Sequence, residues 1–154
     1  MLKLNLEKYK DDAMVFNLSI SNKTERRKIF YGTYTASTTL IPPIKTNIEN
    51  EFSPEYRTHF TEAITLDDFI DKNKIEFIDL IKCDGEGSEP EILEGLKKNC
   101  KKIYYISIDT GPERKNEWTT DSVIALLKQK NFEIIKTPNI KERVVVVAKN
   151  KAFL

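Results

Sequence analysis

The chain has 154 residues, of which 40% are apolar and 32% are charged, with 25 Lys and Arg against 24 Asp and Glu. This length suits a single domain over residues 1–154, and the apolar content argues against wholesale disorder. The net charge of +1 excludes a polybasic protein that binds nucleic acid by charge alone, and no apolar run approaches the ~20 residues of a membrane span.

The N-terminal segment carries charged residues throughout and does not resemble a signal peptide. Together with only two cysteines, this predicts a cytoplasmic protein with reduced thiols and without a nucleic-acid or membrane partner.

The first predicted elements are two strands, at residues 14–20 and 28–31, around a polar turn. Residues 33–62 contain three prolines and are predicted to form a long connection, a type of segment that is usually functional in compact domains.

Three helices are predicted from their capping residues and apolar stripes. Thr65 is an N-cap followed by two Asp in the first turn. Ser88 and Glu91 have the spacing of a capping box. Thr119 or Thr120 begins the third helix. The predicted ranges are 66–72, 89–100 and 120–130.

Four strands are predicted between and after these helices, at residues 77–84, 103–108, 132–135 and 143–148. The first two are apolar on both faces, as central parallel strands should be. The last two are predicted to pair antiparallel, because a parallel crossover needs a dozen or more residues. The alternation of helix and strand predicts an α/β layer structure with a largely parallel sheet.

Two segments that follow the predicted central strands are unusually polar. Their charged side chains are Asp84, Glu86, Asp109, Glu113 and Arg114. Because ligands of open parallel sheets bind beyond the carboxyl ends of the strands, we expect these side chains to share one rim. A carboxylate there could act as a general base, orient a substrate hydroxyl or bind a hard cation such as Mg²⁺.

Each of these residues also has a structural explanation. Asp84 and Glu86 could be turn formers, and Asp109 with Arg114 could be an ion pair that pins a loop. His59 is the single histidine, and it has no acidic, Ser or Cys partner at an interpretable spacing.

Four further residues are explained more simply by structure than by chemistry. The helix dipole accounts for Glu89 and Glu91 at the start of their helix. Cys83 is interpreted as a small core residue, and Trp118 is expected to pack over the loop that precedes it.

Three stretches of sequence carry a family resemblance. They read Thr-Leu-Asp-Asp-Phe-Ile at 65–70, Ile-Asp-Leu-Ile-Lys-Cys-Asp-Gly-Glu-Gly-Ser-Glu-Pro-Glu-Ile-Leu-Glu-Gly at 78–95, and Ser-Ile-Asp-Thr-Gly-Pro-Glu-Arg at 107–114. This ordered set resembles the FkbM family of S-adenosylmethionine-dependent methyltransferases. Gly85 departs from the pattern, since that family usually has a branched apolar residue there.

The resemblance implies O-methylation of a hydroxyl on a sugar or another small metabolite, with S-adenosylmethionine as cofactor and no required metal. It implies a Rossmann-like class I methyltransferase sheet, mostly parallel with an antiparallel C-terminal strand pair. The resemblance also implies three roles for residues of the site. Asp84 would be the base or substrate anchor, with Glu86 as its nearest substitute. Asp109, Glu113 and Arg114 would surround the acceptor, and Ser19 and Ile20 would lie beside the adenine of the cofactor.

The family's glycine-rich strand, turn and helix have no counterpart in this sequence. We therefore expect an incomplete sheet, the C-terminal part of the fold, from a truncated or split enzyme. Two missing strands would leave a gap of roughly 14 Å between residues 14–20 and 77–83. The first of these strands could close that gap, a partner chain or second copy could fill it, or the segment could stay loose.

Two alternatives to an intact methyltransferase site stay open at this point. One is a non-catalytic half-fold that assembles with a partner chain. The other is a divalent-metal phosphotransferase or hydrolase that uses Asp84, Glu86 and Asp109, although no phosphate-cradling glycine loop accompanies them. Binding of S-adenosylhomocysteine would separate the enzyme from the assembly module.

Overall fold

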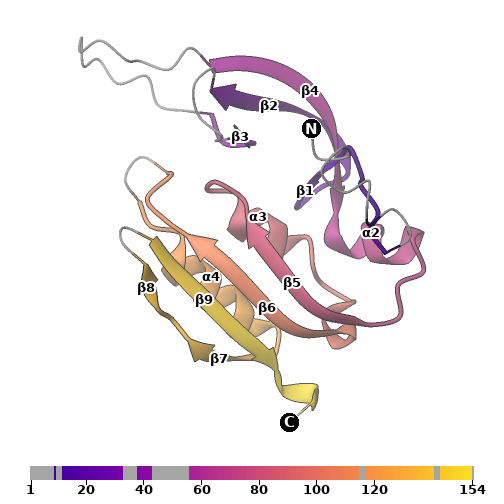
Figure 1. Ribbon diagram of the computed structural model, residues 1–154, viewed down its shortest axis with the longest axis vertical. Coiled ribbons are helices and arrows are strands. Elements are labelled where there is room, and N and C mark those ends of the chain that lie inside the picture. Colours follow the sequence, from indigo (N-terminus) through magenta and orange to yellow (C-terminus); the bar gives the residue numbers. More distant parts are fainter. Residues whose placement is uncertain are drawn as a thin grey trace.

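The computed structural model describes residues 9, 12–32, 38–42, 56–114, 117–140 and 143–153. The described strands form two separate sheets, one from the N-terminal and one from the C-terminal part of the chain, and the helices at 89–94 and 120–129 lie against the second (Figure 1).

The N-terminal sheet has the strand order β1-β4-β2-β3. Its strands are β1 (Ser19–Ser21), β2 (Glu25–Gly32), β3 (Thr38–Thr39) and β4 (Tyr56–Thr65). β1 is parallel to β4, whereas β2 is antiparallel to both β4 and β3. The strand predicted at 28–31 is therefore confirmed within β2, but only the end of the strand predicted at 14–20 forms, as β1.

β3 lies within the segment 33–62 that was predicted as a connection, and β4 begins in it, so that prediction is wrong at residues 38–39 and 56–62. Residues 57–60 are exposed at every position, and a strand exposed on both faces lacks the apolar alternation by which strands are recognised. The parts of that segment at 33–37 and 43–55 lie outside the described residues.

The C-terminal sheet has the order β5-β6-β9-β7, with β8 paired to β9. Its strands are β5 (Ile78–Asp84), β6 (Ile103–Thr110), β7 (Phe132–Lys136), β8 (Asn139–Ile140) and β9 (Arg143–Asn150). β5 and β6 pair in parallel, and β9 is antiparallel to β6, β7 and β8. The predicted antiparallel pair at the C-terminus is confirmed.

The predicted mostly parallel, Rossmann-like sheet is wrong, although the α/β class is correct. The described strands form two mixed sheets, and the N-terminal one is mostly antiparallel. Apolar periodicity predicts where strands occur but not which strands pair. β1 pairs with β4 and not with β5, so the N-terminal strand does not close the expected gap. Among the described strands β5 lies at the edge of its sheet, and Leu80 on it is 55% exposed.

In the described ranges three α-helices follow the predicted order, and two 3-10 turns occur beside them. Their bounds are α2 (Leu66–Lys72), α3 (Glu89–Glu94), α4 (Thr120–Gln129), η2 (Cys100–Lys102) and η3 (Lys151–Phe153). The Thr65 cap is confirmed, since its hydroxyl accepts a hydrogen bond from the Asp68 N–H at 3.0 Å. Thr119 is the N-cap position of α4, as predicted.

α3 is shorter than the predicted helix, and it lacks the predicted capping box. Ser88 makes no side-chain cap hydrogen bond, and the helix ends at Glu94. The chain leaves the helix because Asp67 of α2 accepts hydrogen bonds from the N–H groups of residues 97–99, at 2.8, 3.0 and 3.0 Å. An external carboxylate thus replaces the helical partners of these groups.

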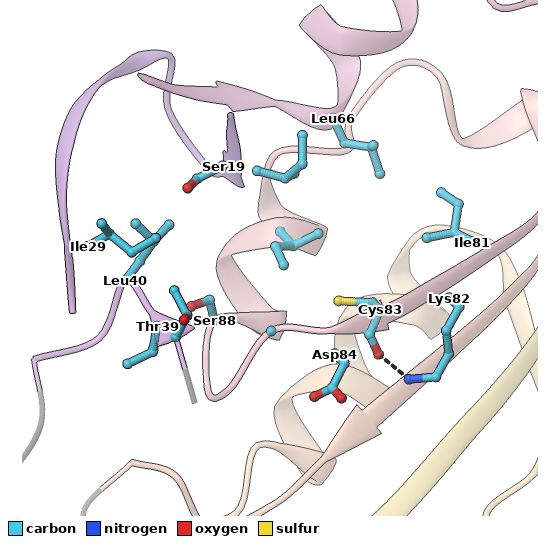
Figure 2. A pocket seen from close by; sticks show the side chains of 14 residues that line it. Ser19, Ile29, Thr39, Leu40, Leu66, Ile81, Lys82, Cys83, Asp84 and Ser88 are labelled. Carbon is cyan, nitrogen blue, oxygen red and sulfur yellow. Dashed lines mark hydrogen bonds between the residues drawn. The ribbon is translucent and has the colours of Figure 1, made fainter. Parts of the chain in front are cut away.

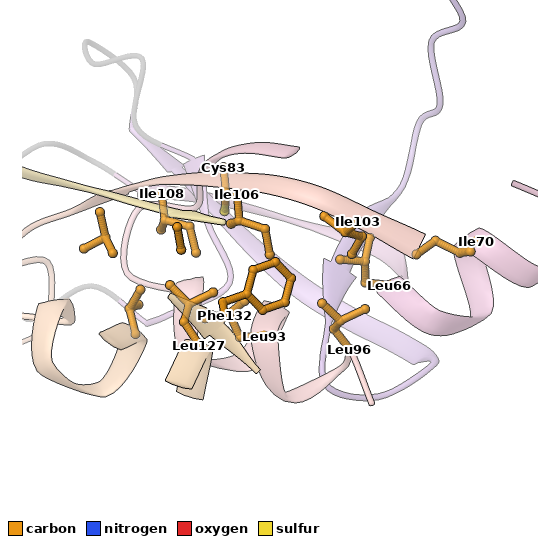
Figure 3. Close-up of a cluster of buried hydrophobic side chains, with 13 residues drawn as sticks. Leu66, Ile70, Cys83, Leu93, Leu96, Ile103, Ile106, Ile108, Leu127 and Phe132 are labelled. Carbon is orange, nitrogen blue, oxygen red and sulfur yellow. The ribbon is translucent and has the colours of Figure 1, made fainter. Parts of the chain in front are cut away.

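The main core lies between the C-terminal sheet and its helices. Figure 3 shows Ile106 and Ile108 of β6 pointing toward Leu93 of α3 and Leu127 of α4, with Phe132 between them. All five side chains are at most 2% exposed. Burial of a side chain of this size contributes about 1.5–3 kcal/mol. This packing fixes the ends of β5 and β6, from which the polar loops extend.

No helix in the described ranges is long and apolar enough to cross a membrane. The assignment of residues 1–154 to a single domain stays a prediction.

Candidate functional site

The site begins at the carboxyl ends of β5 and β6. Asp84 and Asp109 are register partners across these parallel strands. β9 runs antiparallel to β6 and begins where β6 ends, with Val144 opposite Thr110. Arg143, the first residue of β9, is thereby placed beside both aspartates.

Four carboxylates surround Arg143, and together with it they form what we call the acidic cluster. Their nearest guanidinium–oxygen distances are 3.6 Å to Asp84, 3.4 Å to Glu86, 3.7 Å to Asp109 and 3.4 Å to Glu113. None approaches the 2.7–2.9 Å of a tight charge-assisted pair. The guanidinium therefore lies among the four groups without binding one of them tightly.

The acidic cluster carries more negative than positive charge. Partial burial lowers the pKa of Arg143, but the four carboxylates, Glu86 foremost, outweigh this effect and raise the pKa above its usual value. Arg143 therefore remains a cation at any physiological pH. Asp109 Oδ1 and Glu113 Oε2 are buried, with no hydrogen-bond partner in the described part of the chain. Buried acceptors without a donor are costly, so these two oxygens stand out from the other acceptors of the cluster.

A cavity of about 360 Å³ lies next to the acidic cluster, between the two sheets. One side is formed by Ser19, Ile29 and Leu40 of the N-terminal part, and the other by Cys83 and Asp84 of β5 (Figure 2). Its walls are mainly apolar, and its volume falls within the range of about 300–1,000 Å³ typical of small-ligand sites. Asp84 lines this cavity and also belongs to the acidic cluster.

Ser88 supplies an unpaired hydroxyl to the same cavity. The residue is only 4% exposed, and within the described ranges its Oγ has no hydrogen-bond partner. The neighbouring Thr39 hydroxyl is already engaged, because it donates to Glu86 O at 2.7 Å. Ser88 thus adds a buried hydroxyl to this wall of the cavity, beside the carboxylate of Asp84.

The structure brings together most of the residues predicted for the site. Asp84, Glu86, Asp109 and Glu113 gather as expected for one rim, and Ser19 and Ile20 line the adjoining cavity. Arg114 is the exception, since it turns toward α3, pairs with Glu91 and donates to Gly87 O. Arg114 therefore holds the two loops together, and its pairing with Asp109 is wrong.

Two residues of the site were not predicted. Arg143 lies far from the acidic residues in sequence, and only the antiparallel placement of β9 brings it to them. Glu89 was assigned to the helix dipole, yet it is 1% exposed and binds the turn before α3. Its position after a Gly-Glu-Gly turn was the one available signal, because backbone N–H groups of such turns need acceptors.

The remaining candidates lie outside the cluster. His59 is exposed on β4, and Trp118 is 47% exposed, so the expected packing of Trp118 is at most partial. Cys83 packs into the core cluster as predicted, and burial raises its pKa to about 12. Among the described residues, no group of three or more His, Cys, Asp or Glu is arranged to hold a metal ion.

In a comparison with models of protein families, a model described as Methyltransferase FkbM domain matches residues 3–134. No curated protein and no solved structure matches the chain.

Proposed function

We propose that this chain, which belongs to the FkbM methyltransferase domain family, transfers a methyl group from S-adenosylmethionine to a hydroxyl of a sugar or another small metabolite. Methyl transfer itself follows from the family, whereas the donor and the acceptor class are the proposal. The observation that carries it is the double position of Asp84, which lines the apolar cavity and belongs to the acidic cluster. A donor on one side and an acceptor on the other would meet at this carboxylate.

The residues of the cavity fit the proposed donor. Ile20, Ile29 and Leu40 offer an apolar surface to a purine ring, and Ser88 offers a buried hydroxyl without a partner. Ser19 and Ile20 at β1 would lie beside the adenine. When bound, S-adenosylmethionine supplies a sulfonium methyl group that is already an activated electrophile.

The acidic cluster supplies what a hydroxyl acceptor needs. Asp84 would accept the proton of the attacking hydroxyl, with Glu86 as its nearest substitute. The unpaired oxygens of Asp109 and Glu113 would accept hydrogen bonds from further hydroxyls of the acceptor, as a polyol offers. Arg143 offsets part of the negative charge of the four carboxylates.

This arrangement favours methyl transfer over metal-dependent phosphotransfer. The cation at the centre of the four carboxylates is the guanidinium of Arg143, which occupies the position that a divalent ion would need. The methyl-transfer scheme requires no metal. The family match does not favour the non-catalytic assembly module, and cofactor binding would exclude it.

Calorimetry with S-adenosylhomocysteine tests the donor site. Wild-type chain should bind it, and Ile20→Arg should abolish binding because the new side chain fills an apolar wall of the cavity. The matched control is Ile135→Arg, since Ile135 is 53% exposed on β7. Absence of binding to the wild-type chain would contradict the proposed donor.

Transfer of a labelled methyl group tests the chemistry. The wild-type chain is incubated with labelled S-adenosylmethionine and a panel of sugars and other hydroxylated metabolites. Asp84→Asn should keep the binding of S-adenosylhomocysteine but lose transfer. An Asp84→Asn protein with the wild-type rate would remove Asp84 from the role of base.

We also propose that a strand of a partner chain completes the sheet at β5. In the described part of the chain β5 pairs with β6 alone, and Leu80 and Phe77 beside this edge are 55% and 48% exposed. Unpaired strand edges bind other strands readily. A chain that stays monomeric at all concentrations and binds no other component of its enzyme would contradict this.

The free thiols Cys83 and Cys100 support a reducing compartment, such as the cytoplasm, as the location of the protein.

A further inference from the structure

Glu89 is a carboxylate buried almost completely at the first position of α3. It is 1% exposed, whereas a residue that merely complements a helix dipole remains in solvent. Burial raises the pKa of Glu89 above its usual value, and the nearby charge of Glu113 adds to this rise. A carboxylate in such a place is tolerated only if hydrogen bonds compensate for the lost water.

Both oxygens of Glu89 have protein donors. Oε1 accepts hydrogen bonds from the N–H groups of Gly85 and Gly87, each at 3.0 Å. Oε2 accepts one from the Thr119 hydroxyl at 3.1 Å. The Thr119 N–H in turn donates to Gly111 O at 3.2 Å. One side chain therefore joins the turn after β5 to the loop after β6.

The turn that Glu89 binds needs such support. Glu86 has a φ of +46° and Gly87 a φ of +92°, and a non-glycine residue with positive φ persists only where its surroundings enforce it. A Cβ on Gly87 would also lie 3.1 Å from Glu113 Cβ, so the two loops are already in close contact. The two N–H groups on either side of Glu86 are the ones held by Glu89.

These contacts decide where the carboxylates of the acidic cluster lie. Asp84 and Glu86 belong to the turn that Glu89 binds on one side, and Asp109 and Glu113 flank Gly111, which it reaches through Thr119. Arg114 makes a second link through Gly87 O, but at the outer side of the turn. We propose that Glu89 is a positioning residue for the methyl-transfer site, setting the spacing between its two pairs of carboxylates. This inference rests on the proposed function, and Glu89 itself reaches no substrate.

Three substitutions test it. Glu89→Gln keeps an oxygen for both glycine N–H groups and gains an amide that can donate to the Thr119 hydroxyl. Glu89→Ala removes every link, and Thr119→Val removes only the link between the loops. Glu94→Gln, on the exposed side of the same helix, is the matched control.

The first readout is independent of activity. Hydrogen exchange of the Gly85 and Gly87 amides, followed by NMR, should match wild type in Glu89→Gln and in the control. It should be faster by about tenfold in Glu89→Ala, since each amide loses its hydrogen bond. Unchanged exchange in Glu89→Ala would overturn the proposal. If Glu89→Ala does not fold, Thr119→Val decides: it must shift the NMR signals of Gly111 and Glu113, and unshifted signals would overturn the proposal.

The second readout is steady-state kinetics with an acceptor from the active panel. Glu89→Ala or Thr119→Val should lower kcat by up to about 10²-fold, because small displacements of reacting groups cost that much, and Glu89→Gln should restore it to within about threefold. Equal losses in Gln and Ala would show that the charge matters and not the positioning. A wild-type chain without methyl transfer would refute the proposed function alone. The exchange measurement would still decide whether Glu89 holds the turn after β5.

Discussion

Asp84 and Asp109 are register partners at the carboxyl ends of β5 and β6, and Arg143 lies 3.6 Å from the first and 3.7 Å from the second. The two aspartates differ in environment despite this symmetry. The Asp84 side chain is 52% exposed and lines the cavity, whereas the Asp109 side chain is 19% exposed and has a buried oxygen without a partner. The pair is therefore suited to divide proton transfer and acceptor binding between its members.

Substitution of each aspartate should separate these roles. We expect Asp84→Asn to lower kcat by about 10²–10⁴-fold, the usual contribution of a general base. Asp109→Asn should mainly raise KM, by about tenfold for one hydrogen bond to the acceptor. Both variants are measured by steady-state methyl transfer. The control is Asp79→Asn, because Asp79 is exposed on β5. Equal effects on kcat in the two variants would contradict the division.

Removal of the Arg143 charge should make stability depend on pH. In Arg143→Met the repulsion among four carboxylates is no longer offset, so the free energy of unfolding should fall by about 1–2 kcal/mol at pH 7, a modest value because the site is partly solvated. The loss should shrink as the pH falls through the range in which carboxylates gain protons. Urea unfolding at pH 4–8 measures this. Arg143→Lys restores the charge and should recover most of the loss; a pH-independent loss in Arg143→Met would point to packing.

Ionisation of Glu89 should reduce stability at higher pH. Because burial raises its pKa above 4.5, the folded chain holds this proton more tightly than the unfolded chain. The stabilising contribution is therefore complete below pH 4.5 and is lost as the pH rises through the pKa of the folded state. Glu89→Gln cannot ionise, so the free energy of unfolding of wild type should decline relative to this variant as the pH rises. A constant difference from pH 4 to pH 8 in urea unfolding would refute this.

Asp67 should be far more important for stability than its neighbours in the first turn of α2. It accepts hydrogen bonds from three consecutive N–H groups after α3, and it is 7% exposed. Asp67→Ala leaves these donors without a partner and should cost about 3 kcal/mol in urea unfolding. Asp121→Ala, in the exposed first turn of α4, is the control and should change little. Similar unfolding midpoints for the two variants would contradict this role.

Gly95 should be intolerant of a side chain because of its contact with β1. A Cβ at this position would lie 2.3 Å from the backbone oxygen of Ser21, so β1 must move away from α3. We expect Gly95→Ala to cost about 1–3 kcal/mol. It should also weaken the binding of S-adenosylhomocysteine, because Ser19 and Ile20 of β1 line the cavity. Glu94→Gln at the neighbouring position keeps an oxygen for Asn22 and is the control in calorimetry and urea unfolding. Normal binding by Gly95→Ala would show that β1 is not part of the site.

The sequence was sufficient to locate most elements of the C-terminal part. Thr65 and Thr119 mark two helix starts, and the apolar runs mark β5, β6 and β9. It failed where a distant group decides the local structure. α3 ends early because Asp67 takes the N–H groups that a longer helix would use, and β4 has no apolar alternation because both of its faces are exposed at residues 57–60.

The same distinction holds for the site. Asp84, Glu86, Asp109 and Glu113 could be predicted to converge, because each follows a strand whose parallel partner was recognisable. Arg143 could not, since its place depends on the insertion of β9 between β6 and β7. Arg114 was placed on the correct loop, but its direction is decided by Glu91 on α3. Sequence patterns thus predicted which residues lie on the rim better than which of them form ion pairs.

The hydrogen bond from Thr39 Oγ1 to Glu86 O joins residues 47 positions apart and connects β3 with the turn after β5. Thr39 lines the cavity, so this bond ties the N-terminal wall of the cavity to the loop that follows β5. A ligand that is too large for the space between wall and loop would enter only after this bond opens. The speed of entry would then depend on how often the two sheets part, even if the strength of binding does not. Loss of the Thr39 hydroxyl would consequently change the association rate constant more than the dissociation constant.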